Sequence, residues 1–218
     1  MSSQLFPLFI DAFFETLIMV GVSAVLAFVL GLPLALLLVL TSPGGIYSSP
    51  RVYRSVGLLV DGVRSTPFIV LLVLLIPLTR LLIGTSIGVG AAIVPLTLSI
   101  TPYFARIAEI SLREVHKGLI EAAQAMGCER LHIVRHVLLP EALPGIAAAC
   151  TIAVVSLFNI SAMAGVLGAG GLGDLAIRYG FDRYEPTIMF TVVAILFVLV
   201  TSAQKAGDGI VGYLRRNM

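Results

Sequence analysis

Long apolar runs alternate with short polar segments along this chain, and the pattern predicts helices that cross a membrane. A helix needs about 20 apolar residues to span the hydrocarbon core of a bilayer. Runs of this length lie at about residues 17–40, 65–83, 87–105, 143–165 and 188–210. We therefore expect an all-α integral membrane protein with five transmembrane helices, organised as a single domain over residues 1–218.

Proline and glycine indicate where these helices bend or end. Pro33 lies inside the first run and is expected to kink it. Pro67 stands near the start of the second run, where a helix tolerates proline. The turn at Gly84, Thr85 and Ser86 is so short that the second and third spans are expected to form an antiparallel hairpin.

Composition supports a membrane location. Hydrophobic residues make up 58% of the chain and charged residues 12%, whereas soluble domains are roughly 45–50% apolar and about 25% charged. The first 15 residues contain no Lys or Arg. They therefore lack the basic region of a cleaved secretory signal, which favours an N-terminus that crosses the membrane. Cys128 and Cys150 are expected to be free thiols.

The positions of lysine and arginine predict the orientation, because cytoplasmic loops carry an excess of these residues. With the N-terminus outside, the inner segments contain Arg51, Arg54, Arg64, Arg106, Arg113, Lys117, Arg130, Arg135, Lys205, Arg215 and Arg216. The outer segments then contain Arg80, Arg178 and Arg183. We therefore expect the N-terminus outside, the C-terminus in the cytoplasm, and residues 115–140 in the cytoplasm.

The first half of this polar segment predicts a short exposed helix. Leu119–Met126 is expected to be helical and to end at Gly127. Alanines on this helix would let another surface approach closely. Glu121, assigned to the first turn, would suit the positive helix end and could pair with a basic residue of a partner.

The second half predicts a connection to the fourth span. Cys128–Val137 is expected to be helical, with Ile133 and Val137 four residues apart and packed together. Pro140 and Pro144 would then redirect the chain. The result is a cytoplasmic helical loop anchored at both ends in transmembrane helices.

Few residues point to chemistry within the chain. His132 and His136 lie four apart, but no Cys or acidic ligand joins them on one face, so no metal site is expected. Arg106 and Glu109 favour a local ion pair at the membrane border over a substrate site. Because no nucleophile–base pair is visible, the chain is not expected to be an enzyme.

A glycine-rich stretch imitates a cofactor motif. Gly168, Gly170 and Gly173 satisfy G-x-G-x-x-G, but a dinucleotide site needs a strand before the glycines, and here a membrane helix precedes them. The nucleotide-binding pattern G-x-x-x-x-G-K-[ST] occurs nowhere in the sequence. We expect these glycines to let outer loops pack or move, no cofactor on this chain, and any ATP hydrolysis on a partner.

The polar segment resembles the EAA loop of ABC importer permeases. Glu121-Ala122-Ala123 is followed after three residues by Gly127, after nine more by Val137, and then by Leu139-Pro140. Val137 stands where that family has isoleucine. The resemblance implies a coupling helix that docks into a cleft of an ATP-hydrolysing subunit, through Glu121, Ala122, Ala123, Met126 and Gly127. The alternative is an amphipathic loop on the membrane surface.

Within that family the chain is most similar to permeases of methionine importers. The matching stretches, within about residues 60–180, are Arg64–Phe68, Pro77–Arg80, Gly84–Gly88, Ala92–Thr97, Leu138–Gly145, Ser161–Met163 and Gly168–Gly173. The resemblance implies a bacterial inner-membrane protein that forms a homodimer. Its partners would be a homodimeric ATPase that holds ATP and magnesium, an external methionine-binding lipoprotein and membrane lipid, with no nucleic acid.

Two alternatives remain at this point. The nearer is a permease for another small amino acid or polar substrate. The farther is a stand-alone channel or carrier, although a proton-coupled carrier usually has ionisable groups deep in its spans. The first, fourth and fifth predicted spans have none in their interiors, since Lys205 and Asp208 lie near the inner end of the fifth, which disfavours this class.

The fourth span contains the candidate pathway residues. Asn159 and Ser161 are polar at membrane depth, which favours positions facing protein over positions facing lipid. Met163 lies near the outer end of the span, and its flexible thioether could fill a narrow gap. By resemblance, Met163 is a candidate for an external gate. Ordinary helix packing is the alternative for these residues.

Overall fold

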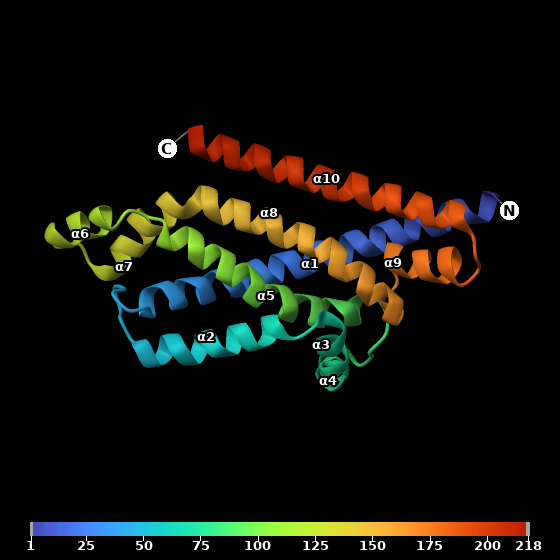
Figure 1. The fold of residues 1–218 in the computed structure, drawn as a ribbon, viewed down its shortest axis with the longest axis horizontal. Coiled ribbons are helices and arrows are strands. Elements are labelled where there is room, and N and C mark those ends of the chain that lie inside the picture. The colour runs from blue at the N-terminus through green and yellow to red at the C-terminus, as the bar shows by residue number, and fades with distance from the viewer. Residues whose placement is uncertain (1, 217–218) are drawn as a thin grey trace.

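The computed structural model describes residues 2–216, and every regular element in this range is a helix (Figure 1). In chain order the α-helices are α1 (Ser2–Thr41), α2 (Pro50–Ser65), α3 (Phe68–Leu74), α4 (Ile76–Ile83), α5 (Val89–Arg113), α6 (Lys117–Ala125), α7 (Arg130–Ile133), α8 (Leu139–Ala164), α9 (Gly171–Leu175) and α10 (Pro186–Arg216). Three π-helical segments are η1 (Val134–Leu138), η2 (Gly165–Ala169) and η3 (Ala176–Phe181). The all-α prediction is confirmed for the described residues.

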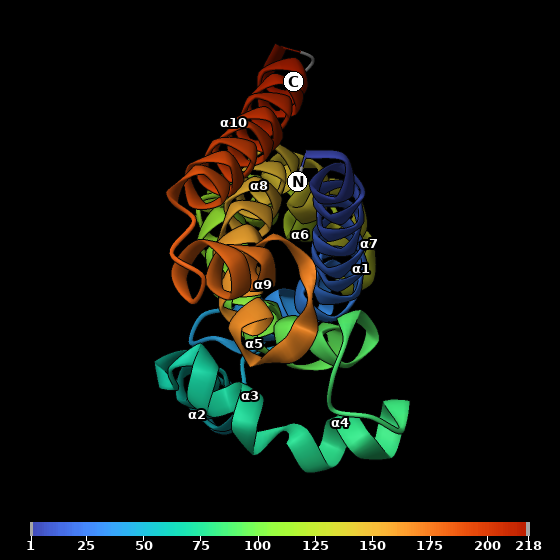
Figure 2. The same cartoon turned by 90° about the vertical axis from the view of Figure 1, so that its right-hand side faces the viewer.

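Three long helices, α1, α5 and α8, pack together through the centre of the molecule (Figure 1). α10 lies along α8 on one side, and α2, α3 and α4 contact α5 on the other. α6 and α7 project at one end of the bundle, whereas α9 lies at the opposite end (Figures 1 and 2). The two ends of the chain lie at opposite ends of the bundle (Figure 1).

Small residues allow the central helices to approach closely, which is typical of helix packing in membranes. Ala27 of α1 and Ala105 of α5 are fully buried. Phe104 of α5 is 1% exposed, and its ring lies 4.8 Å from that of Phe28 of α1, measured between centroids. Gly31 leaves room for this pair, because a Cβ there would lie 2.6 Å from the Phe104 ring.

Within residues 2–216, four helices are long and apolar enough to cross a membrane. They comprise Phe6–Thr41, Val89–Arg113, Arg130–Ala169 and Pro186–Arg216. A fifth crossing is present if α2 and α3 count as one span, with a bend of 105° between them. The structure therefore supports four to five crossings.

The predicted second span, residues 65–83, is not one continuous helix. Thr66 is extended, with a ψ of 125°, because the ring of Pro67 disfavours a helical conformation for the residue before it. Pro77 lies in the first turn of α4, where its missing N–H is tolerated. These prolines start new helices and so divide the run into α3 and α4. α3 and α4 both contact α5, but α4 runs across the end-on view of Figure 2 and not along α5, so the predicted antiparallel hairpin is not formed.

The fourth span also differs from the prediction, because α7, η1 and α8 form one helical run over Arg130–Ala169. Pro140 cannot donate a hydrogen bond to the preceding turn, and its ring crowds that turn. The wider π turn of η1, in which Leu139 N bonds to Val134 O, precedes it and relieves this crowding. Pro140 and Pro144 therefore lie within a continuous helical run and do not end it.

Exposed apolar side chains form stripes on the outer helices. On α1 they recur every three or four residues, at Phe6, Ile10, Phe14, Ile18, Val22, Val25 and Val29. On α10 they include Phe190, Val193, Phe197 and Val198. Large exposed apolar surfaces mark contact with lipid or protein. On helices this long and apolar, they support a location in the membrane.

Candidate functional site

The polar segment forms α6 at the end of the bundle where α5 stops. His116 is the N-cap, and its Nδ1 accepts a hydrogen bond from Gly118 N at 3.1 Å. Gly127 follows the helix with a φ of 77°, the left-handed conformation that favours glycine. α6 (Lys117–Ala125) therefore corresponds to the helix predicted over Leu119–Met126 and begins earlier.

Because α6 begins earlier, Glu121 lies in its second turn and not in the first turn as predicted. The positive helix end therefore contributes little to this carboxylate, since its effect is confined to the first turn. Glu121, Ala122 and Gly127 are exposed, and Met126 is 76% exposed. Ala123 is 4% exposed and packs against the chain itself. Four of the five predicted coupling residues are therefore accessible to a partner.

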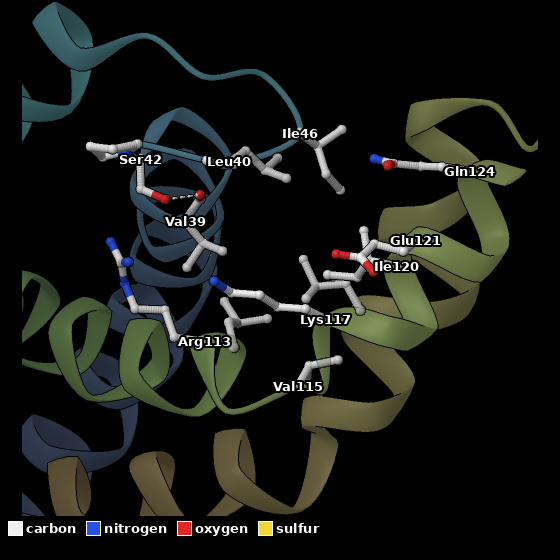
Figure 3. A pocket seen from close by; sticks show the side chains of 15 residues that line it. Val39, Leu40, Ser42, Ile46, Arg113, Val115, Lys117, Ile120, Glu121 and Gln124 are labelled. Atoms are coloured by element: carbon white, nitrogen blue, oxygen red, sulfur yellow. Dashed lines mark hydrogen bonds between the residues drawn. The ribbon is translucent and has the colours of Figure 1, made fainter.

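A cavity of about 410 Å³ lies between α6, the end of α5 and the turn that follows α1 (Figure 3). Lys117 and Glu121 line it from α6, and Arg113 lines it from α5. Ile46 and Ile120 supply part of its apolar wall. The surface at this end of the molecule thus offers charges of both signs around an apolar hollow.

α7 and η1 connect this surface to α8. Ile133 is fully buried, Val134 is 6% exposed and Leu138 is 1% exposed. Val137, predicted to pack with Ile133, is only half-buried. This run continues into α8 without a break, so α7 and α8 belong to one helical segment.

An ion network joins α2 to the end of α5, and we call Asp61, Arg106, Glu109 and Arg113 the α2–α5 charge network. Arg106 donates to Asp61 twice, from Nε to Oδ1 at 3.0 Å and from Nη2 to Oδ2 at 2.7 Å. Arg106 Nη1 also donates to Glu109 Oε2 at 2.7 Å. Glu109 Oε1 accepts from Arg113 Nη2 at 2.7 Å.

The predicted Arg106–Glu109 ion pair is therefore confirmed, but sequence reasoning missed Asp61. Asp61 and Arg106 are 45 residues apart, so no local spacing relates them. The signal for Asp61 in the sequence is its position as an acidic residue among the basic residues of segment 51–64. A count of lysines and arginines alone does not identify its partner.

At the opposite end of the bundle, two side chains of α1 hold the start of α9. Glu15 Oε2 accepts a hydrogen bond from Gly171 N at 2.6 Å, and Thr16 Oγ1 accepts one from Leu172 N at 2.9 Å. Gly171 has a φ of 77°, and a Cβ there would lie 2.7 Å from Thr16 Oγ1. Glycine is therefore required at this contact.

The glycines of the G-x-G-x-x-G stretch have structural explanations. Gly168 and Gly170 have φ values of 88° and 84°, which favour glycine. Gly173 packs against Ala162 of α8 so closely that a Cβ would overlap the backbone. These constraints account for all three glycines without a ligand.

The candidate pathway residues lie on two faces of α8. Asn159 and Met163, four residues apart, are exposed on one face. Ser161 is 2% exposed, and its Oγ donates to Phe158 O at 2.9 Å. The structure therefore groups Asn159 with Met163 and places Ser161 in the core. The exposed position of Asn159 faces protein only if another chain covers this face.

The histidines and cysteines form no cluster with other ligands. The rings of His132 and His136 stack with centroids 4.1 Å apart. Within residues 2–216, no group of three or more His, Cys, Asp and Glu residues is arranged to hold a metal ion. Cys128 and Cys150 are both free thiols.

An all-helical bundle with four to five apolar crossings and a polar helix at one end is typical of a multi-pass membrane protein. Residues 27–217 match the family of binding-protein-dependent transport system inner membrane components. The chain belongs to this family and is an inner-membrane protein.

Individual relatives agree over most of the chain. A probable D-methionine transport system permease protein MetI from Vibrio cholerae serotype O1 is 50% identical over 204 residues, covering 94% of this chain and 91% of the relative. The D-methionine transport system permease protein MetI of Escherichia coli K12 is 50% identical over 165 residues, 76% of each chain. A chain of the inward-facing MetNI methionine ABC transporter has a TM-score of 0.96 at 48% identity, over 98% of this chain and 99% of that one.

Proposed function

We propose that this chain is the transmembrane subunit of an ATP-driven methionine importer. The observation that carries the proposal is the similarity to the methionine ABC transporter chain, with 48% identity over 98% of the present chain. Because the match covers 98% of this chain, it includes the central helices and α6, the surface that would meet a partner. The chain itself carries no nucleotide-binding loop of the G-x-x-x-x-G-K-[ST] kind, so ATP and magnesium would bind to the partner.

The proposed topology has five crossings, with the N-terminus outside and the C-terminus in the cytoplasm. α2 and α3 together would form the second crossing, despite the bend of 105° between them. Arg51 and Arg54 at the start of α2, together with the lysines and arginines around α6 and at the end of α10, support this orientation. α6 and its cavity would then face the cytoplasm, and the Glu15–Gly171 contact would lie near the outer surface.

In the proposed mechanism, α6 acts as the coupling helix. A homodimeric ATPase would dock on Glu121, Ala122, Met126 and Gly127, which are exposed together. ATP binding would close the ATPase and displace α6, and α7 would carry the movement into α8. Two copies of the permease would then rock between inward-open and outward-open states.

The proposed pathway lies on the exposed face of α8 that carries Asn159 and Met163. In a homodimer this face would meet the corresponding face of the second copy, which would cover Asn159 at membrane depth. Met163, near the outer end, would form the external gate. An external binding lipoprotein would deliver methionine there and supply much of the specificity.

The decisive experiment measures ATP hydrolysis and methionine uptake by the whole complex in proteoliposomes. The proposal predicts that both activities depend on the binding protein and on methionine together. ATP hydrolysis stimulated by a different amino acid, with methionine inactive, would retain the permease class but replace the substrate. Purification of the chain from native membranes with no ATPase subunit bound would favour a channel or carrier.

A further inference from the structure

α2 is attached to the bundle by few apolar contacts. Of its 16 residues, Gly57 and Val60 are the buried ones. Leu58 and Leu59 are 75% and 71% exposed. Elements with little buried apolar surface are the ones that most readily move on their own. Another kind of contact is needed if α2 is to keep its place on α5.

Polar and cationic contacts supply that attachment on three successive turns of α2. Arg113 of α5 lies over the ring of Tyr53, with its Cζ 5.5 Å from the centroid. Arg106 Nη2 donates to Gly57 O at 3.3 Å, and both ends of its guanidinium fork bind Asp61. A bidentate arginine–carboxylate pair fixes orientation as well as distance. Tyr53, Gly57 and Asp61 are each four residues apart, so α5 contacts a single face of α2.

Glu109 holds the two arginines in this arrangement. It is 4% exposed, and it accepts hydrogen bonds from Arg106 and from Arg113. A buried carboxylate is costly unless it is paired, so this residue restrains both guanidinium groups. The α2–α5 charge network is thus continuous from Asp61 to Arg113, and Arg113 lines the cavity beside Glu121.

We propose that Asp61 and Arg106 are positioning residues that make α2 move with α5 whenever α6 is displaced. The inference rests on the proposed function, since it concerns how movement of the coupling helix spreads. Residues 114–116 join α5 to α6, and α2 leads through the 105° bend into α3. A displacement of α6 therefore reaches α3 through the network, in addition to reaching α8 through α7.

The test replaces the ion pair by a removable covalent link. Asp61→Cys and Arg106→Cys are combined in a chain that also carries Cys128→Ser and Cys150→Ser. The complex with its ATPase and binding protein is reconstituted, and methionine uptake per ATP hydrolysed is measured. Measurements are made before and after a short bifunctional methanethiosulfonate, which forms a disulfide with each thiol and releases methanesulfinate, and again after reduction of those disulfides.

Without the link, uptake per ATP is expected to fall at least about fivefold, the lower end of typical coupling between sites. The bifunctional reagent is expected to restore most of the loss, and reduction to remove it again. A monofunctional reagent is the control and should restore nothing. An unchanged ratio before linking overturns the proposal, as does a ratio that stays low after linking.

Two further measurements keep the outcome decisive. If the double variant does not assemble, Asp61→Asn and Arg106→Lys are measured singly, and each is expected to lower the same ratio. Arg106→Lys keeps the charge but loses the bidentate fork, and an unchanged ratio for both variants overturns the proposal. The cysteine-free parent reports on the proposed function separately, because its failure to import methionine would refute that function whatever the variants do.

Discussion

Glu121 is exposed on α6, and no ion pair to it forms within residues 2–216. An exposed carboxylate without a partner in its own chain is free to pair with a basic group on a docking subunit. Such charge pairs across an interface fix register and partner choice. The role of Glu121 therefore depends on the negative charge of its carboxylate and not on how its side chain packs.

Glu121→Lys is accordingly expected to lower methionine uptake at least about tenfold, because a like-charge contact across an interface costs several kcal/mol. Uptake is measured in membrane vesicles, and the amount of inserted permease is measured by immunoblotting. Glu129→Lys is the matched control. Glu129 is also exposed, but it lies at the N-cap position of α7 without a side-chain capping hydrogen bond, in the connecting half of the segment, so its reversal should leave uptake close to normal. Normal uptake by Glu121→Lys would exclude the docking role.

Met163 and Ser161 offer a second comparison between single side chains. Met163→Ala removes a flexible thioether from the exposed face of α8 and is expected to open a gap at the proposed gate. The expected result is a higher rate of ATP hydrolysis without methionine, or a leak, in proteoliposomes. Ser161→Ala should change neither, because its hydroxyl bonds only within α8. Equal behaviour of the two variants would remove Met163 from the gate.

At the scale of elements, a close helix contact outside the centre lies between α8 and α10. Gly207 of α10 packs directly on Thr151 of α8, where a Cβ would overlap the threonine side chain. Thr151 is held by its own hydrogen bond to Ala147 O at 3.0 Å. The contact therefore has little room to adjust.

Gly207→Ala is expected to lower the free energy of unfolding by about 1–3 kcal/mol, the usual cost of overpacking a close contact. The matched control is Gly209→Ala on the same helix, where no atom lies within 4 Å of the added Cβ. That change should be neutral or stabilising by up to about 1 kcal/mol, since alanine favours helix. Thermal unfolding of the solubilised complex measures both. A Gly207→Ala protein as stable as the control would mean that α10 can shift away from α8.

The elements that sequence could predict are those governed by local rules. Long apolar runs gave α1, α5, α8 and α10, and the glycine at 127 gave the end of α6. Pro67 and Pro77 can be read from the sequence. Neighbouring packing, however, decides whether a proline only starts a helix or also interrupts a span. Pro140 shows the opposite case, in which a π turn absorbs the proline and the helix continues.

The contacts that sequence could not predict all join distant segments. The pairing of Asp61 with Arg106 and that of Glu15 with Gly171 connect residues 45 and 156 positions apart. Glu15 lies before the predicted start of the first span at residue 17, whereas α1 already includes it. Its role depends on the position of α9 beside α1, which no local pattern predicts.

The whole molecule places its polar contacts at two ends of an apolar bundle. The α2–α5 charge network and the α6 cavity lie toward one end, and the Glu15–Gly171 contact lies toward the other (Figure 1). The central helices α1 and α8 connect the two ends, and both contact α9 as well as α5. In an importer that rocks as rigid bodies, movement of α6 would thereby reach the outer end through continuous helices.

This arrangement predicts which surfaces a reagent can reach from outside the cell. Tyr184 precedes α10 and is 85% exposed. Tyr213 lies near the end of α10 and is 69% exposed. In a chain carrying Cys128→Ser and Cys150→Ser, Tyr184→Cys should react with a membrane-impermeant maleimide in spheroplasts. Tyr213→Cys should react only after the membrane is permeabilised, because the proposed orientation puts the end of α10 inside. The reverse labelling pattern would invert the proposed orientation and put α6 on the outer surface, where no ATPase could reach it.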